Sequence, residues 1–286
     1  MNFSVLISTY KKENPKYLDE ALCSIWDLQT IKPSEIVLVK DGPLSEELDI
    51  VIDTWKKRIN EKLNVIELPK NVGLGLALKI GLQECRFELV ARMDTDDISV
   101  NNRFEKQLRY FKENPTVDIV GGYIYEFIDV IENVIGIRGV PTSDIKIKKY
   151  LRKRSPFNHV TVMFKKEAVL VSGNYQEWYC YEDYYLWSRM LINNHIFGNI
   201  PENLVYVRVG KNVYARRGGW KYYKSVAKLH KFMLENKIIK WHEYLYNVLN
   251  RFVVQILMPN KIRSFMYQKL LRKNLTNTNV PANIPI

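Results

Sequence analysis

Continuous apolar runs and segments with helical spacing take turns along the first third of the chain. The apolar runs predict four buried strands: Phe3–Ile7, Ile36–Val39, Asn64–Leu68 and Leu89–Met93. The segments between them predict helices over Tyr17–Leu28, over Leu48–Ile59, and from the 71–75 loop through Leu82. Strands that are apolar throughout and alternate with helices are typical of a parallel sheet covered on both faces. The pattern therefore predicts an α/β fold with a Rossmann-like, mainly parallel sheet.

The pattern is less regular beyond residue 100. We expect a helix over Arg103–Lys112, strands within Val117–Ile128 around a pair of glycines, and a strand over Val160–Phe164. After Val209, lysines and apolar residues recur on opposite sides of a helical projection, and a second helix is expected over Trp241–Leu257. We therefore divide the chain into two halves of one α/β domain, residues 1–98 and 99–209, and a basic helical region, residues 210–286.

Composition and charge narrow the classes of protein. The chain has 286 residues, 47% of them hydrophobic and 12% aromatic, which excludes disordered, collagen-like and low-complexity proteins. Residues 1–204 carry 27 basic and 29 acidic side chains, whereas residues 205–286 carry 16 and 2, so the C-terminal part supplies the whole net charge of +12. Such a basic region predicts an anionic partner: a nucleic acid, a phospholipid surface or a phosphate-bearing substrate.

The cysteines and the apolar segments indicate the cellular compartment of the protein. The three cysteines are too few and too scattered for a disulfide framework or a zinc site, and Cys23 and Cys85 are expected to be buried thiols. The first residues lack the pattern of a signal peptide, and no run approaches the roughly 18 apolar residues of a spanning helix. We expect a cytoplasmic protein that at most lies on a membrane.

Carboxylates gather where the predicted parallel strands end. Ser8-Thr9-Tyr10, Asp41 and Asp94-Thr95-Asp96-Asp97 each follow an apolar strand, and ligands of open parallel sheets bind outside these ends. We therefore expect the three segments to line one crevice. Carboxylates so close together repel one another, and hard oxygen ligands of this kind suit Mg²⁺ or Mn²⁺. The alternative is a solvated turn and helix cap, since aspartate is common in both.

These motifs, taken in order, resemble the bacterial family 2 glycosyltransferases, inverting enzymes of the GT-A fold that build O-antigen, capsule and exopolysaccharide. Val5–Tyr10 resembles the family's first strand and uracil-contacting loop. Val37–Gly42 resembles its second strand, although Lys40 stands where the family usually has the first of two aspartates. Three later segments are similar to the family's next loop, its metal-binding segment and its acidic catalytic segment: Asn71–Gly75, Arg92–Asp97 and Glu182–Trp187.

The resemblance implies a role for each matching residue. Asp183 is the general base for the acceptor hydroxyl, and Glu182 places the acceptor or the base. Asp96 is the first ligand of a Mn²⁺ or Mg²⁺ cofactor, and Asp94 is a second ligand or a ribose contact. The implied donor-binding residues are Ser8, Thr9, Tyr10, Asp41, Asn71, Gly73, Arg92 and Asp94. For the two acidic residues the alternative is a helix N-terminus, which favours negative charge.

Seven aromatic residues fall within Tyr175–Trp187. Their rings can offer flat faces to a sugar, and a rigid hydrophobic core explains them equally well. Trp187 is a candidate for acceptor contact, as is His159, which precedes a predicted strand where family members often have histidine. A structural role is the alternative for each.

The resemblance implies transfer of a hexose or N-acetylhexosamine from a UDP-sugar to a lipid-diphosphate-linked saccharide acceptor in O-antigen synthesis. One direct displacement inverts the anomeric centre, so an α-linked donor gives a β-linkage. The basic tail then lies on the anionic inner face of the cell membrane, with Trp220, Tyr222 and Trp241 near the headgroups. The enzyme is therefore expected to be cytoplasmic and peripherally bound to that membrane, with no nucleic-acid partner.

Two alternatives stay open. A nucleic-acid-binding protein would place Arg216-Arg217 and the C-terminal lysines on phosphates, although no base-reading module accompanies them. Another metal-dependent nucleotide-sugar enzyme of similar topology would share the strand-end carboxylates and would not need Asp183.

Overall fold

Alternate side chains of the central strands enter two separate cores, which accounts for their uninterrupted apolar sequence. Leu6 of β1 (Phe3–Thr9) contacts one core, whereas its neighbours Val5 and Ile7 contact the other. The side chains of β2 (Glu35–Lys40) divide in the same way. Because both faces of the sheet are apolar, both need cover.

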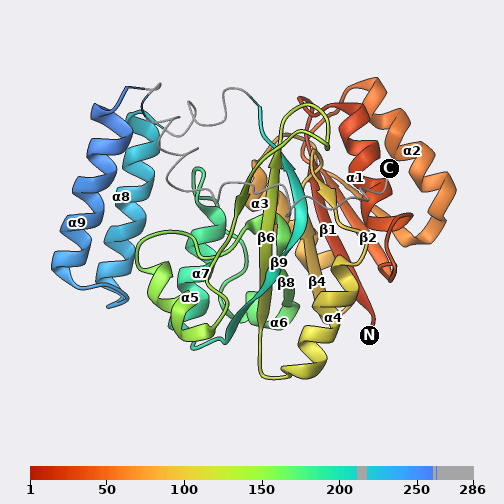
Figure 1. The fold of residues 1–286 in the computed structure, drawn as a ribbon. Coiled ribbons are helices and arrows are strands. Elements are labelled where there is room, and N and C mark those ends of the chain that lie inside the picture. The colour runs from red at the N-terminus through yellow and green to blue at the C-terminus, as the bar shows by residue number, and fades with distance from the viewer. Residues whose placement is uncertain (211–217, 260–261, 263–286) are drawn as a thin grey trace.

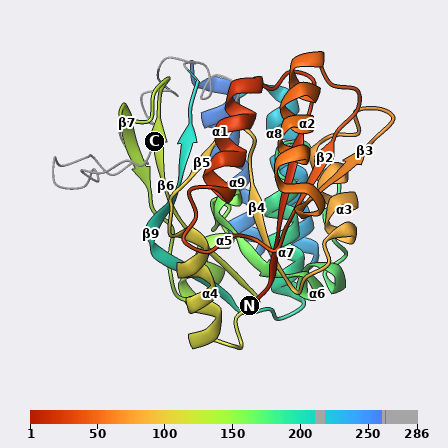
Figure 2. The ribbon, with the colours of Figure 1, turned by 90° about the vertical axis from the view of Figure 1, so that its right-hand side faces the viewer.

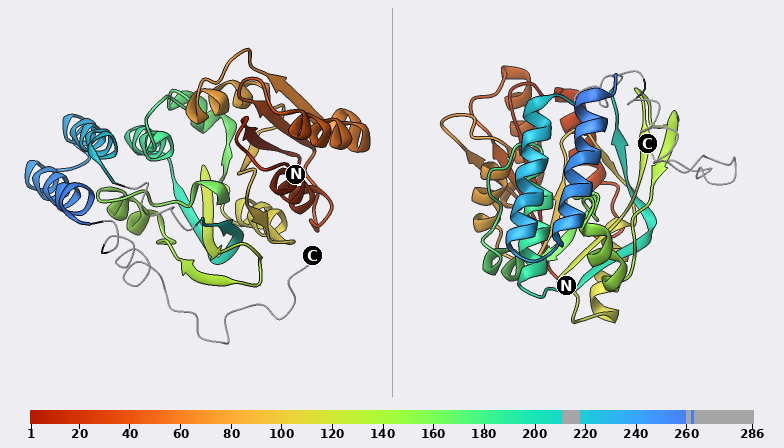
Figure 3. Two further views of the ribbon diagram at one scale, coloured as in Figure 1. Left: turned by 90° about the horizontal axis from the view of Figure 1, so that it is seen from above. Right: turned by 90° about the vertical axis from the view of Figure 1, so that its left-hand side faces the viewer.

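Helices cover the two faces and give three layers (Figure 1; from above, Figure 3). This computed structural model describes residues 1–210, 218–259 and 262. The helices are α1 (Pro15–Trp26), α2 (Glu46–Ile59), α3 (Leu74–Glu84), α4 (Arg103–Glu113), α5 (Asp144–Leu151), α6 (Lys166–Val171), α7 (Glu182–Ile192), α8 (Trp220–Glu235) and α9 (Trp241–Phe252). The core on one face is shared with α1, α2 and α4, and the core on the other with α3, α5, α6, α7 and α8. Figure 2 views the sheet from the side of α1 and α2.

The sheet is parallel in its first half and mixed in its second. The remaining strands are β3 (Leu63–Glu67), β4 (Leu89–Met93), β5 (Ile98–Ser99), β6 (Ile119–Phe127), β7 (Val134–Arg138), β8 (Met163–Lys165) and β9 (Phe197–Arg208). Their order is β3-β2-β1-β4-β8-β6-β9-β5, and β7 pairs with β6. The first four strands in this order are parallel, as expected, whereas β8 runs antiparallel to both β4 and β6.

Three parallel strands end at the same edge of the sheet. Thr9 of β1 pairs with Lys40 of β2, and Ile7 of β1 pairs with Met93 of β4. The polar segments that follow these strands therefore begin next to one another, and this edge is where a ligand crevice is expected.

The glycine pair in the middle of the chain does not interrupt a strand. β6 continues through Gly121 and Gly122, although its pairing with β9 shifts register directly after them. A Cβ on Gly121 would lie 2.5 Å from Asn199 Oδ1, and a Cβ on Gly122 would lie 2.5 Å from Leu204 Cδ1. The two glycines therefore allow β9 and its side chains to approach closely, and they do not mark a turn.

The strand expected over Val160–Phe164 is shorter and begins later. His159–Thr161 forms a 3₁₀ turn, because the carbonyl oxygen of Asn158 accepts hydrogen bonds from both the N–H and the hydroxyl of Thr161, each at 2.8 Å. β8 begins only at Met163.

All three cysteines are free. Cys85 is buried at the end of α3, and burial raises the pKa of its thiol to about 12. Cys23 is half-buried and Cys180 is exposed, so the expectation of buried thiols holds for Cys85 alone.

The C-terminal helices α8 and α9 form a hairpin at one side of the domain (Figure 3, right). α8 buries Val226, Leu229 and Met233 in the core that it shares with α7. Tyr222, expected near lipid headgroups, instead packs its ring against Tyr181 at 5.1 Å between centroids. Within the described ranges, no helix is long and apolar enough to cross a bilayer. The Arg216-Arg217 pair lies outside the described residues.

Candidate active site

Asp41 ties the end of β2 to the loop before α3. Its carboxylate accepts hydrogen bonds from the Val72 N–H (2.7 Å), the Gly73 N–H (3.0 Å) and Asn71 Nδ2 (2.9 Å). Gly73 has φ = +89°, a conformation that suits glycine, and it caps α3. The structure thus brings together three of the residues predicted to bind the donor, and it shows Asp41 holding the loop.

The end of β1 lies beside Asp41, whose N–H donates to the Thr9 carbonyl at 2.8 Å. Thr9 is buried, and its Oγ1 has no hydrogen-bond partner among the described residues. Ser8 is half-buried and Tyr10 is exposed. The strand end therefore offers a hydroxyl without a partner and an exposed ring next to the Asp41 loop.

Lys40, the departure from the family's pattern, is held by two carboxylates. Its ammonium lies 2.7 Å from Asp49 of α2 and 2.7 Å from Glu67 of β3. Its charge is thus compensated by residues of its own flank of the sheet. Within the described residues, Asp41 is therefore the one carboxylate that directly follows β2.

The three aspartates after β4 have different surroundings. Asp94 lies 2.5 Å from Arg92 Nη1, and buried Asp97 accepts a 2.8 Å hydrogen bond from the Arg208 N–H. Burial, together with the charge of Asp94, raises the pKa of Asp96 to about 6. Burial and the charges of Asp96 and Asp94 raise the pKa of Asp97 well above its usual range. The loop thus carries more negative charge than its surroundings compensate.

Glu13 faces the same loop and was missed by sequence reasoning. It is half-buried between β1 and α1 and accepts a hydrogen bond from the Thr95 side chain. Burial, followed by the charges of Asp96 and Asp94, raises the pKa of Glu13 to about 7. A glutamate in a short polar loop gives no periodic signal, so only the folded chain reveals this neighbour.

The acidic loop fits a divalent cation by its chemistry. Carboxylate oxygens are hard ligands, and the pKa values of Glu13 and Asp96 are raised first by burial and then by repulsion between carboxylates, both of which a cation would offset. Across residues 1–210, 218–259 and 262, no three His, Cys, Asp or Glu side chains are already grouped around one metal position. Mg²⁺ and Mn²⁺ sites usually need only one or two carboxylates, because ligand phosphates and water complete them. Asp94 and Asp96 are the residues suited to this role.

A second acidic pair begins α7. Asp183 is half-buried and accepts hydrogen bonds from Ser155 Oγ (3.2 Å) and from the Tyr184 N–H. Burial raises the pKa of Asp183 in spite of these hydrogen bonds. Burial and the charge of Asp183 raise the pKa of Glu182 to about 7. A carboxylate whose pKa is raised in this way accepts a proton more readily near neutral pH.

The acidic residues that follow β4 and those that begin α7 lie near the same parts of the chain. A Cβ on Gly75, in the first turn of α3, would lie 2.8 Å from the Gln176 carbonyl oxygen and 3.3 Å from Glu182 Cβ, so α7 begins against the donor loop. Arg92 is 1% exposed, and its positive charge opposes the rise in the pKa of Asp96 on one side and of Glu182 on the other. One buried guanidinium thus acts on carboxylates of both groups.

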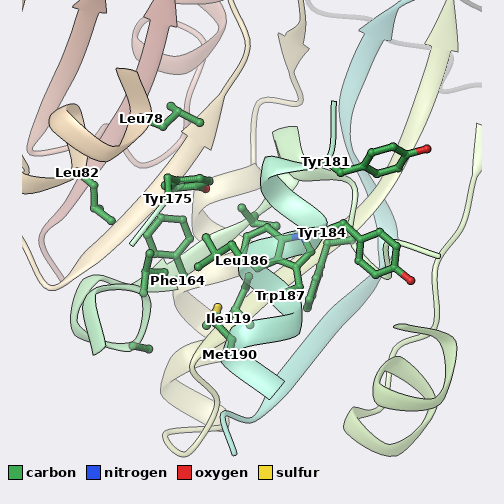
Figure 4. Close-up of a cluster of buried hydrophobic side chains, with 14 of the residues drawn as sticks. Leu78, Leu82, Ile119, Phe164, Tyr175, Tyr181, Tyr184, Leu186, Trp187 and Met190 are labelled. Carbon is green, nitrogen blue, oxygen red and sulfur yellow. The ribbon is translucent and has the colours of Figure 1, made fainter. Parts of the chain in front are cut away.

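The aromatic segment before and within α7 is mainly core. Figure 4 shows Tyr175, Tyr184 and Trp187 among aliphatic side chains. Trp187 is 0% exposed and packs edge-on against Phe157 (5.3 Å) and His159 (6.0 Å). His159 Nε2 is 3.0 Å from the Tyr175 hydroxyl, and burial holds the pKa of His159 well below its usual value. His159 is therefore neutral, and acceptor contact by either residue stays a prediction.

Comparisons with known proteins identify the family and the fold of the chain. The sequence pattern of Glycosyl transferase family 2 matches residues 4–171. The amylovoran biosynthesis glycosyltransferase AmsE of Erwinia amylovora is 40% identical over 267 residues, which cover 93% of this chain and 98% of that protein. The UDP-Gal:alpha-D-GlcNAc-diphosphoundecaprenol beta-1,3-galactosyltransferase of Escherichia coli is 39% identical over 273 residues, covering 96% and 98%.

A solved structure supports the fold. The crystal structure of S. aureus TarS 1-349 in complex with UDP-GlcNAc superposes with a TM-score of 0.65 at 21% identity, over 88% of this chain and 73% of that one. The fold and family expected from the motifs are both confirmed. The chain belongs to Glycosyl transferase family 2 and is a glycosyltransferase with the GT-A fold.

Proposed function

We propose that this glycosyltransferase moves a hexose or N-acetylhexosamine from a UDP-sugar to a sugar hydroxyl of a lipid-diphosphate-linked acceptor, with inversion of the anomeric carbon. The product belongs to a surface polysaccharide such as O-antigen, and the enzyme works on the inner face of the cell membrane. The name of the E. coli relative makes UDP-galactose the first donor to test and a diphosphate-linked GlcNAc the first acceptor. The UDP-GlcNAc bound to TarS favours a uridine nucleotide.

The observation that carries the proposal is the meeting of two acidic groups at one edge of the sheet. Asp94 and Asp96 follow β4, Glu182 and Asp183 begin α7, and the charge of Arg92 acts on both groups. Glycosyl transfer needs charge compensation at the leaving diphosphate and a base at the acceptor hydroxyl. The two groups supply these two requirements separately.

Asp183 is the general base in this proposal. The acceptor hydroxyl gives its proton to an oxygen of Asp183 as the hydroxyl oxygen bonds to the anomeric carbon. The bond from that carbon to the diphosphate oxygen breaks, and its electron pair leaves with UDP. Attack from the opposite face inverts the centre, so an α-linked donor gives a β-linkage. Ser155, which donates to Asp183 Oδ2, orients the carboxylate, and Glu182 places the acceptor.

Residues at the strand ends bind the donor in this proposal. The buried Thr9 Oγ1 has no partner in the described chain, which suits it to the nucleotide, and Ser8 and Tyr10 flank it. The loop that Asp41 fixes, with Asn71 and Gly73, forms the opposite wall. Asp94 and Asp96 would hold Mn²⁺ or Mg²⁺. Such a cation, when bound, supplies positive charge to the diphosphate.

The test is release of UDP and formation of product from a panel of UDP-sugars with and without Mn²⁺. We expect turnover with the natural donor to be lost in Asp183→Ala and in Asp96→Ala, and to persist in Asp53→Ala, which alters an exposed aspartate of α2. Transfer by Asp183→Ala at the wild-type rate would show that the base has been assigned wrongly. Transfer from GDP- or TDP-sugars alone would contradict the uridine donor.

A further inference from the structure

Two unlike rows of side chains are exposed on the α8–α9 hairpin, whose ribbon faces the viewer in Figure 3 (right). The first, here called the α9 stripe, continues from α9 into the π-helical turn Val253–Leu257. It consists of apolar and aromatic side chains that are between 47% and 70% exposed: Trp241, Leu245, Tyr246, Leu249, Val253 and Leu257. The second, here called the lysine row, lies along exposed positions of α8: Lys221, Lys224, Lys228 and Lys231.

The polarity of α9 is the reverse of an ordinary surface helix. Between Trp241 and Phe252 the buried residue is Asn247, whose Nδ2 donates to the Arg152 carbonyl oxygen at 2.9 Å. Arg152 also bonds the Ile238 carbonyl oxygen at 3.0 Å. Polar contacts thus help to hold α9 to the body, whereas the side chains of the α9 stripe are exposed. An apolar surface that the fold itself does not use marks an interaction site.

The charge of the hairpin indicates which kind of partner covers the α9 stripe. From residue 218 to residue 258 the chain has seven basic and two acidic side chains. One of the acidic side chains, Glu243, is already 3.4 Å from Arg152. A second copy of this face would bring two lysine rows together, which like-charge repulsion opposes. An anionic lipid surface complements both rows, because its acyl region takes apolar side chains and its headgroups take lysines.

We propose that the hairpin seats on an anionic leaflet, with the α9 stripe inserted in the interface and the lysine row on the phosphates. Trp220 and Trp241, 58% and 70% exposed, lie at the two outer ends, and tryptophan is favoured at headgroup level. Apart from Trp220 at its first position, α8 contributes charge, since its apolar face is buried in the core that it shares with α7. This inference deepens the proposed function and rests on it, because a lipid-linked acceptor is reached from such a surface.

The test is sedimentation of the full chain with vesicles of phosphatidylcholine containing 30 mol% phosphatidylglycerol, as a roughly physiological anionic fraction, and with pure phosphatidylcholine. We expect wild-type protein to bind the anionic vesicles and to be released by salt. Leu245→Glu with Leu249→Glu should abolish binding, whereas Ile50→Glu, at a 58% exposed site on α2, should not alter it. Lys224→Gln with Lys231→Gln should weaken binding roughly 25-fold, about fivefold per lysine. The matched control is Lys57→Gln with Lys62→Gln.

Several outcomes would overturn the proposal. The first is wild-type protein that does not bind anionic vesicles, and the second is a stripe variant that binds them as tightly as wild type. The third is a wild-type chain that forms a dimer and binds no vesicles, with a stripe variant that is monomeric. If a variant fails to fold, the dependence of wild-type vesicle binding on salt and on anionic lipid still tests the proposal. Transfer to a water-soluble acceptor is measured in parallel and should be unchanged in the stripe variant. Absence of this transfer in wild-type protein would count against the proposed function. Absence of vesicle binding by a wild-type protein that does transfer the sugar would count against the docking surface alone.

Discussion

Asp41 should contribute to stability as well as to donor binding, because its carboxylate is already engaged within the protein. In Asp41→Ala the N–H groups of Val72 and Gly73 lose acceptors at 2.7 and 3.0 Å, while Asn71 keeps its weaker 3.2 Å bond to the Asp41 carbonyl. A hydrogen bond to a charged group contributes about 1.5–3 kcal/mol. Asn71 Nδ2 also loses its 2.9 Å bond to the carboxylate but is left with the carbonyl as acceptor, so we count only the two N–H groups. The loop is partly exposed, and the lower value for each N–H group gives together about 3 kcal/mol.

A loss of that size lowers the melting temperature by about 6–12 °C in a domain of this length. Circular dichroism during heating measures it, and a urea titration should show an earlier midpoint with unchanged slope. Asp53→Ala, an exposed aspartate on α2, is the control. Asp41→Ala should also raise the KM for the UDP-sugar, because the loop that it holds starts α3. A melting temperature within 2 °C of wild type, on a scale of about 2–4 °C per kcal/mol, would refute the reasoning.

Further predictions concern the two acidic groups. Asp183→Asn should lower kcat by about 10²–10⁴-fold with an unchanged melting curve, as measured by UDP release. Activity should fall as pH drops below about 7, because the Glu182–Asp183 pair, in which the pKa of Glu182 is raised to about 7, takes up a proton there; Glu182→Gln removes the neighbouring charge and should move that limb of the pH–rate profile to lower pH. Glu13→Gln removes a charge beside Asp96 and should raise the Mn²⁺ concentration for half-maximal activity; an unchanged metal titration would contradict this role. Gly75→Val should lower the rate of sugar transfer in larger proportion than the free energy of unfolding, because the valine side chain would meet Gln176 and Glu182 where α3 and α7 approach each other.

The parallel half of the sheet could be predicted because its signal is local. A run such as Val5-Leu6-Ile7 is apolar without interruption since each residue enters one of two cores, and that requires helices on both faces. Once the strands are parallel, Asp41 and Asp94 must lie at one edge. The strand-end carboxylates could therefore be assigned to one edge of the sheet from the sequence.

Other features depend on contacts between distant segments. Gly121 and Gly122 were expected to separate strands, but β9, nearly eighty residues later, comes close enough to need both. Glu13 meets Asp96 only after β1 and β4 have paired. The α8–α9 hairpin shows the same limit. Helical spacing correctly gives an apolar and a lysine side to α8, but only packing reveals that the apolar side of α8 is buried and that of α9 is exposed.

The anomeric configuration of the product tests the central claim most directly. The chain is incubated with an α-linked UDP-sugar, UDP-galactose first, a GlcNAc-diphospholipid acceptor and Mn²⁺, and the isolated product is examined by proton NMR. The account predicts a β-linked sugar whose formation is lost in Asp183→Asn and kept in Asp53→Ala. An α-linked product, or β-linked product formed equally by Asp183→Asn, would contradict inversion with Asp183 as the base.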